Sequence, residues 1–160
     1  MQKVKKKAKK LAEDTSKVNK EIRYGKDKFN FTNGDSYEGE YIVINNEEIY
    51  RHGYGVYKTS DLDEYRALWD YDCIASDAHI IYSNSAEYKG EFNNEGAMNG
   101  KGVYIFPDGS SLNATWKDNL PIADFIYKDP LGYNWQGNES LDKEMVVFTP
   151  ENYVCREDYN

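Results

Sequence analysis

The side chains that most often carry catalysis or bind metals are few in this chain of 160 residues. His52 and His79 are its two histidines, and Cys73 and Cys155 are its two cysteines. Their positions give neither a Cys-x-x-Cys nor a His-x-x-x-His spacing, so no zinc site is predicted. The glycines in residues 53–55 do not lead from a strand into a helix, which argues against a phosphate-binding loop. We therefore expect no catalytic residues, no enzyme and no cofactor.

The composition favours a thin architecture over a thick core. Only 39% of the residues are hydrophobic, whereas 15% are aromatic, and 15 of these residues are tyrosines. No run of about eighteen apolar residues is present, so we expect no membrane-spanning segment. The N-terminus lacks the apolar region of a signal peptide, and two cysteines make no disulfide framework. Both observations favour a reducing, cytoplasmic compartment.

The net charge of −8 is distributed unevenly along the chain. Residues 1–23 carry nine Lys and Arg against three acids, a net charge of +6, and the remainder carries eleven against twenty-five, a net charge of −14. An acidic body repels phosphates, so we expect no nucleic-acid partner. Any surface that attracts anions is confined to the first two dozen residues.

An internal repeat organises the rest of the chain. YEGEY at residues 37–41 recurs as YKGEF at 88–92, and HGYGVY at 52–57 recurs as NGKGVY at 99–104. The same offsets reveal weaker copies, so that strands are predicted to start near residues 37, 65, 88, 112 and 135. Extra residues at 42–51 predict an extended loop. The pattern indicates consecutive antiparallel hairpins, with about two strands in each repeat.

These motifs resemble the MORN repeat, over roughly residues 24–138. The resemblance implies an all-β fold, an elongated and twisted single-layer antiparallel sheet of successive β-hairpins with a groove. It assigns His52 to a turn. The second and fourth repeats depart from the pattern, which predicts that they bend the groove differently or lack a close contact between ring and backbone. The departures are Ala67, Ser76, Ala78, Ala114, Ala123 and Phe125.

One face of the predicted sheet alternates aromatic rings with residues that have little or no side chain. The rings, predicted to form a partner-binding groove, are Tyr37, Tyr41, Tyr57, Tyr65, Trp69, Tyr88, Phe92, Tyr104, Trp116, Tyr127 and Trp135. The small residues are Gly39, Gly53, Gly55, Ala67, Gly90, Gly100, Gly102, Ala114 and Gly137. The opposite, solvated face carries Glu38, Glu40, Arg66, Lys89, Glu91 and Lys101.

Glycine between two rings indicates that the rings lie flat on a bare backbone. Aromatic pairs contribute about 0.5–1.5 kcal/mol beyond their buried area, which partly offsets the cost of about 0.5–1 kcal/mol for glycine within a strand. Two interpretations stay open. The rings are the core of a small sheet, or they form a groove for another segment, because a single layer leaves one aromatic face uncovered.

A basic arm is predicted at residues 1–23. A heptad stripe predicts an amphipathic helix, formed by Val4, Ala8, Leu11, Thr15, Val18 and Ile22. The lysines around it are Lys3, Lys5, Lys6, Lys7, Lys9 and Lys10. The arm is solvated or packed on its own acidic sheet, docked on another protein or on a filament such as a microtubule, or bound to anionic lipid. An acidic tail with a short strand is predicted at residues 139–160, and whether that strand is an edge strand or folds back stays open.

The resemblance implies a non-enzymatic scaffold or adaptor whose groove holds a helical or extended segment of a partner protein. MORN-repeat proteins of this size are associated with cilia and flagella, so the expected setting is an axonemal assembly such as a radial spoke. The alternative is a peripheral membrane adaptor that uses its basic arm on anionic phospholipid.

Overall fold

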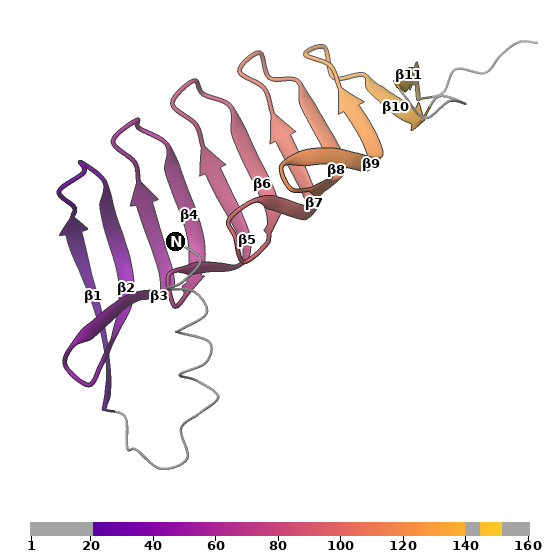
Figure 1. The fold of residues 1–160 in the computed structure, drawn as a ribbon. Helices are drawn as coiled ribbons and strands as arrows, with labels where there is room; N and C mark the ends of the chain where they lie inside the picture. The colour runs from indigo at the N-terminus through magenta and orange to yellow at the C-terminus, as the bar shows by residue number, and fades with distance from the viewer. Residues whose placement is uncertain (1–20, 140–144, 152–160) are drawn as a thin grey trace, which may run out of the picture.

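The described part of the chain is one open antiparallel sheet of eleven strands in sequence order. A computed structural model describes residues 21–139 and 145–151. Figure 1 shows the strands side by side in a long twisted row from β1 to β11. No helix and no second sheet occur among the described residues. The predicted all-β single-layer architecture is confirmed.

The strands begin where the repeat predicts them. The predicted starts fall one residue inside β2, β4, β6, β8 and β10. The C-terminal strand β11 pairs with β10 and is an edge strand. The strands are β1 (Ile22–Asn30), β2 (Ser36–Ile44), β3 (Glu48–Lys58), β4 (Glu64–Asp70), β5 (Cys73–Ile81), β6 (Glu87–Phe92), β7 (Met98–Ile105), β8 (Ser111–Lys117), β9 (Leu120–Lys128), β10 (Asn134–Glu139) and β11 (Val146–Pro150).

Two expectations are wrong at their boundaries. The predicted helical stripe runs to Ile22, but Ile22 begins β1 and pairs with Ile44. The lysines of the basic arm and the rest of its stripe lie outside the described residues, as do residues 140–144 and 152–160. The extended loop predicted at 42–51 is instead the continuation of β2 and β3. A three-residue connection at 45–47 joins the two strands, and within it Asn45 and Asn46 have φ of 53° and 60°.

A wide bulge interrupts the pairing within each long hairpin. Gly39 pairs with Gly55 and Tyr41 with Arg51, so one residue of β2 faces three of β3. Gly53 lies in this bulge with φ of 88°, and the Glu40 carboxylate accepts a hydrogen bond of 3.0 Å from the Tyr54 N–H. Gly100, with φ of 104°, lies in the equivalent bulge beside Glu91. Gly53 and Gly100 therefore provide the left-handed backbone of the bulges, a different role from the predicted one of making room for rings.

Tyr37 and Tyr88 lie on the bare backbone of glycine pairs in the repeats, and the Tyr41 ring lies in the same way on Gly25. A Cβ added at Gly55 would overlap the Tyr37 ring, and a Cβ at Gly102 would overlap the Tyr88 ring. The Tyr37 hydroxyl then donates to the Glu40 carbonyl at 2.6 Å, which is in the stretch where the bulge interrupts the ladder. The predicted contact between ring and glycine backbone is present in these two units.

Tryptophan completes the packing from the next unit. The Trp69 Nε1–H donates to the Gly55 carbonyl at 3.1 Å, and the Trp116 Nε1–H donates to the Gly102 carbonyl at 3.0 Å. The Trp69 ring meets the Tyr37 ring edge-on, with 6.0 Å between centroids. The structural unit therefore spans two repeats, in which a tyrosine covers the glycines of one repeat and a tryptophan binds them from the next.

This two-repeat unit explains the alanines of the departing repeats. Ala67 pairs with Ala78 in the slot that holds glycine pairs elsewhere. No buried tyrosine hydroxyl bonds to the backbone across this pair among the described residues, so a methyl group fits. Tyr65 packs against the cluster that contains Ala67 and Ala78, so the lack of a close contact between ring and backbone in these repeats stays a prediction.

We expect Gly55→Ala to destabilise the fold, because the new methyl group displaces the buried Tyr37 ring. Overpacking of this kind costs about 1–3 kcal/mol, and urea unfolding of the purified chain measures it. Gly96→Ala is the control. A Cβ at Gly96 meets nothing within 4 Å, and only its φ of 82° is unfavourable for alanine. Equal losses from both substitutions would contradict a specific contact between ring and glycine.

Candidate functional site

The strand register places the predicted rings and slots on one face. Residues that pair across antiparallel strands share a face, and Tyr37 pairs with Tyr57, Tyr57 with Tyr65, and Tyr88 with Tyr104. The row continues to the C-terminal end, where Tyr127 pairs with Trp135. We call this continuous surface the aromatic face.

The rings of the aromatic face divide into a floor and a contact layer. Tyr37 and Tyr88 are 1% and 0% exposed, and Trp69 and Trp116 are also buried. These four rings belong to the core, and their hydroxyl and N–H groups donate to backbone carbonyls. A partner would therefore contact other rings of this face. The partly exposed rings, which form the contact layer, are Tyr41, Tyr57, Tyr65, Phe92, Tyr104, Tyr127 and Trp135.

A hollow on this face lies over β1–β3. Its volume is about 590 Å³, and its lining includes the rings of Phe29, Phe31 and Tyr41. Phe31 is 44% exposed and Ile49 is 56% exposed at its mouth. An apolar hollow with exposed hydrophobic side chains at its rim is the kind of surface that binds another molecule. We call it the N-terminal pocket.

Arg51 is a wall of this pocket that the sequence did not predict. Its guanidinium carbon lies 4.0 Å from the Trp69 ring centroid and 4.8 Å from that of Tyr57. Its Nε donates to the Asp72 carboxylate at 3.0 Å. The pocket therefore combines apolar rings with one paired charge. The repeat itself could have placed Arg51 on this face. Arg51 pairs with Tyr41 in the first unit as Met98 pairs with Phe92 in the second.

Asp72 also ties neighbouring hairpins together. Its carboxylate accepts the Arg51 N–H at 2.9 Å, and its own N–H donates to the Arg51 carbonyl at 3.1 Å. Asn119 repeats both bonds with Met98, at 2.8 Å and 3.1 Å. Both residues have φ near 67°, which Asp and Asn adopt more readily than most residues. The clamp holds the walls of the aromatic face in place.

At the other end of the pocket, Tyr57 donates a short hydrogen bond to the Asp35 carboxylate. Burial and this bond raise the pKa of Tyr57 to about 12. The same bond, together with one from the Ser60 N–H, lowers the pKa of Asp35 below its usual value. Both groups therefore keep their ordinary ionisation at neutral pH, and they act by holding the ring of Tyr57 in position.

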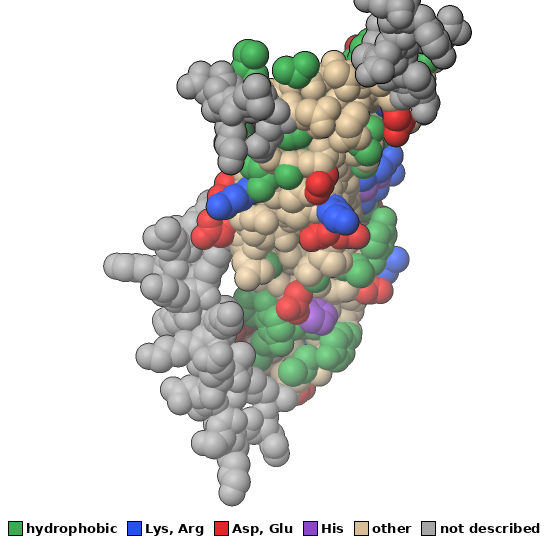
Figure 2. Space-filling view, turned by 90° about the vertical axis from the view of Figure 1, so that its right-hand side faces the viewer, with side chains coloured by type: hydrophobic (Ala, Val, Ile, Leu, Met, Phe, Trp, Pro, Cys, Tyr) green, Lys and Arg blue, Asp and Glu red, His purple; other side chains and the backbone are tan. Residues whose placement is uncertain are grey.

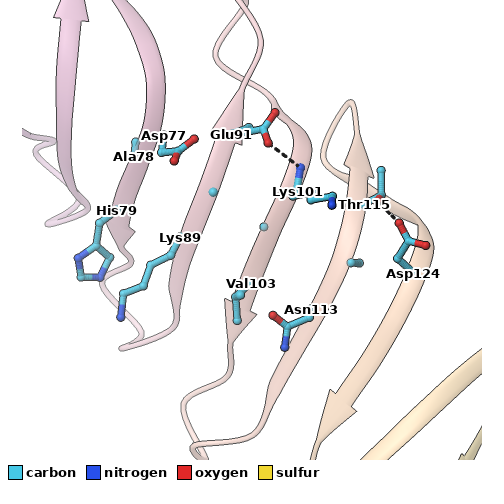
Figure 3. A pocket seen from close by; sticks show the side chains of 13 residues that line it. Asp77, Ala78, His79, Lys89, Glu91, Lys101, Val103, Asn113, Thr115 and Asp124 are labelled. Atoms are coloured by element: carbon cyan, nitrogen blue, oxygen red, sulfur yellow. Dashed lines mark hydrogen bonds between the residues drawn. The ribbon is translucent and has the colours of Figure 1, made fainter.

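A second hollow, of about 830 Å³, lies on the opposite face (Figure 3). Its floor is the backbone of the small-residue row, and charged side chains stand on both sides. His79 Nε2 lies 2.7 Å from the Glu87 carboxylate and Lys89 Nζ lies 2.8 Å from it, and the Lys89 and His79 contacts lower the pKa of Glu87. Two basic side chains that line the hollow, His79 and Lys89, are therefore paired with one carboxylate at its edge.

The remaining candidate chemistry is structural in the described residues. His52 lies at the bulge, with its Nδ1 3.2 Å from the Asp70 carboxylate. Within the described ranges no group of three or more His, Cys, Asp or Glu is placed to hold a metal ion. The same ranges hold no helix that is long and apolar enough to cross a membrane.

We expect the free energy of unfolding to fall as the pH rises from about 10 to about 12. Burial raises the pKa of Tyr37 and of Tyr88 to about 12, whereas an unfolded tyrosine ionises near 10. A raised pKa means that the stabilisation is complete below pH 10 and is lost as the pH passes through the folded value. Urea unfolding between pH 8 and pH 12 measures it. Tyr88→Phe should flatten this decline, and an unchanged slope would contradict the assignment.

A comparison with known protein families matches segments that contain the bulge residues and their glycines. The family model described as the MORN repeat matches residues 49–63 and 88–111. The first segment contains the bulge residues of β3 with Gly53 and Gly55. The second contains Tyr88 and the paired Gly90 and Gly102. A comparison with curated proteins gave no match.

Proposed function

Because the chain is a MORN-repeat protein, we propose that it is a non-enzymatic scaffold or adaptor that holds a polypeptide segment of a partner on its aromatic face. MORN repeats generally mediate protein or membrane interactions and are not catalytic. The observation that carries the proposal is the N-terminal pocket, where Phe31 and Ile49 leave apolar surface exposed. A polypeptide is the occupant that an apolar surface of this size and length fits.

The chemistry of the pocket favours a peptide over a purely apolar ligand. Aromatic rings accept apolar side chains, while Asn33 and the pair of Arg51 and Asp72 present polar groups at its two ends. Peptide N–H and C=O groups need hydrogen-bond partners when they leave water. The buried floor of Tyr37 and Trp69 keeps the surface rigid, which lowers the entropic cost of binding.

The second candidate is a peripheral membrane adaptor whose basic arm binds anionic phospholipid. The sequence from residue 24 onward has a net charge of −14, as counted above, so the sheet itself is repelled by anionic lipid. Only the arm would supply the attraction. Flotation of the full chain with vesicles containing phosphatidylserine tests this candidate, and failure to float would remove it.

The proposal includes the setting expected from the resemblance, a subunit of a ciliary or flagellar axonemal assembly such as a radial spoke. Its support is the resemblance and the extent of the repeat array along the described residues. Microscopy of the tagged protein in its own cells tests the setting. A signal that excludes cilia and flagella would overturn this part and would leave the scaffold proposal standing.

We expect the immobilised full chain to enrich specific peptides from a phage-displayed library of random twelve-residue peptides. Substituting both Phe31→Ser and Ile49→Ser should weaken binding of the enriched peptides by about tenfold or more, because the rim of the pocket loses its apolar contacts. Titration of synthetic versions of those peptides measures the dissociation constants.

Leu131→Ser is the matched control, because Leu131 is exposed but lies in the turn between β9 and β10, away from the pocket. This control should bind like the wild type. Equal weakening in both variants, or no enrichment, would argue against the aromatic face as a polypeptide-binding groove.

A further inference from the structure

A second row of rings lies on the face opposite the aromatic face. Tyr24 pairs with Ile42 and Ile42 with Tyr50, so the row starts on the face that alternation assigns to Glu38 and Glu40. The centroids of Tyr24 and His52 are 6.3 Å apart, and those of His52 and Tyr71 are 5.5 Å apart. Tyr50 continues the row at 5.5 Å from Tyr71. We call these four rings the tyrosine row.

Two rings of the tyrosine row are open to solvent, and Tyr50 and His52 are half-buried beside them. Tyr24 is 75% exposed, and Tyr71 is also exposed. On the face seen in Figure 2, hydrophobic side chains, which include tyrosines in that colouring, gather beside a histidine and an acidic side chain near the lower end of the sheet. The proposed groove does not use this surface, since the N-terminal pocket is lined from the other face.

Carboxylates flank the tyrosine row. Glu48 accepts a hydrogen bond of 3.0 Å from the Tyr50 hydroxyl, and Asp70 lies 3.2 Å from His52 Nδ1. Glu21 and Glu47 are exposed at the same rim, where Asn45 bonds to the Glu21 carbonyl. No Lys or Arg of the described ranges forms an ion pair with any of these four carboxylates. Exposed rings beside carboxylates that have no Lys or Arg partner form a site for ammonium groups.

We propose that the lysine-rich segment at residues 3–10 of this same chain docks on the tyrosine row. Six lysines lie in that segment, and residues 1–23 carry a net charge of +6 against −14 for the remainder. The ammonium groups bind over the tyrosine faces and pair with the flanking carboxylates. The docked segment covers a surface of this face and leaves the aromatic face free for a partner.

The place where the described chain begins favours this occupant. Glu21 is three residues before Tyr24, so the segment is attached at the tyrosine row. Glu21 lies eleven positions after Lys10, and a random coil of eleven residues has an r.m.s. span of roughly 18 Å. A segment held so close has a high effective concentration, which favours it over a basic segment of another molecule.

The test is trypsin digestion of the full chain at low ionic strength, with the rate of cleavage after Lys3 to Lys10 followed by mass spectrometry. Substituting both Tyr24→Ser and Tyr71→Ser should raise this rate about fivefold, because cleavage follows the undocked fraction. The difference should disappear at about 0.5 M salt, which screens the charge attraction.

A second variant guards against a folding defect. Glu48→Gln with Asp70→Asn leaves the rings in place and should raise the cleavage rate in the same direction. Tyr133→Ser is the matched control, because Tyr133 is 66% exposed beyond the row and should leave the rate unchanged. Equal rates in wild type and both variants would overturn the proposal. Protection that grows with protein concentration would also overturn it, since the occupant would then be the segment of another copy.

Discussion

The contact between a tyrosine ring and a bare glycine backbone is the constraint on which the rest of the sheet depends. A single layer has no second sheet to bury its rings, so the rings must be buried against their own backbone. Tyr37 and Tyr88 do this because Gly55 and Gly102 have no Cβ. The wide bulges provide the hydrogen-bond acceptors for these rings. The tyrosine hydroxyls donate to the Glu40 and Glu91 carbonyls, which lie where the strand pairing is interrupted.

The fold could be predicted in detail from the sequence, because its information is local and repeated. The alternation of rings and small residues around Gly39 recurs around Gly90. It predicts which residues form strands, which face each side chain lies on, and where each strand begins to within one residue. The candidate site was predicted less well, because the bulges add two residues to one strand of a pair. That shift brings Arg51 over Trp69 and turns Gly53 away from the rings. The period-two pattern alone does not contain the shift.

The same constraint separates structural from functional rings. The repeated tyrosines Tyr37 and Tyr88 are buried against the backbone and form the floor. Less regular neighbours, such as Phe31 and Tyr41, remain partly exposed and can contact a partner. Because the floor is fixed, the two faces can be used separately. One face offers an apolar pocket with a paired arginine, and the other offers the tyrosine row with its carboxylates.

A double-mutant cycle between Gly55→Ala and Tyr37→Leu tests the central claim most directly, with free energies of unfolding from urea denaturation. If the penalty of the added methyl group comes from the Tyr37 ring, it should fall to less than half once leucine replaces that ring, which gives a coupling free energy of about 1 kcal/mol. A penalty that is the same in both backgrounds would mean that Gly55 is required by its backbone alone, and the account of the aromatic face would be wrong.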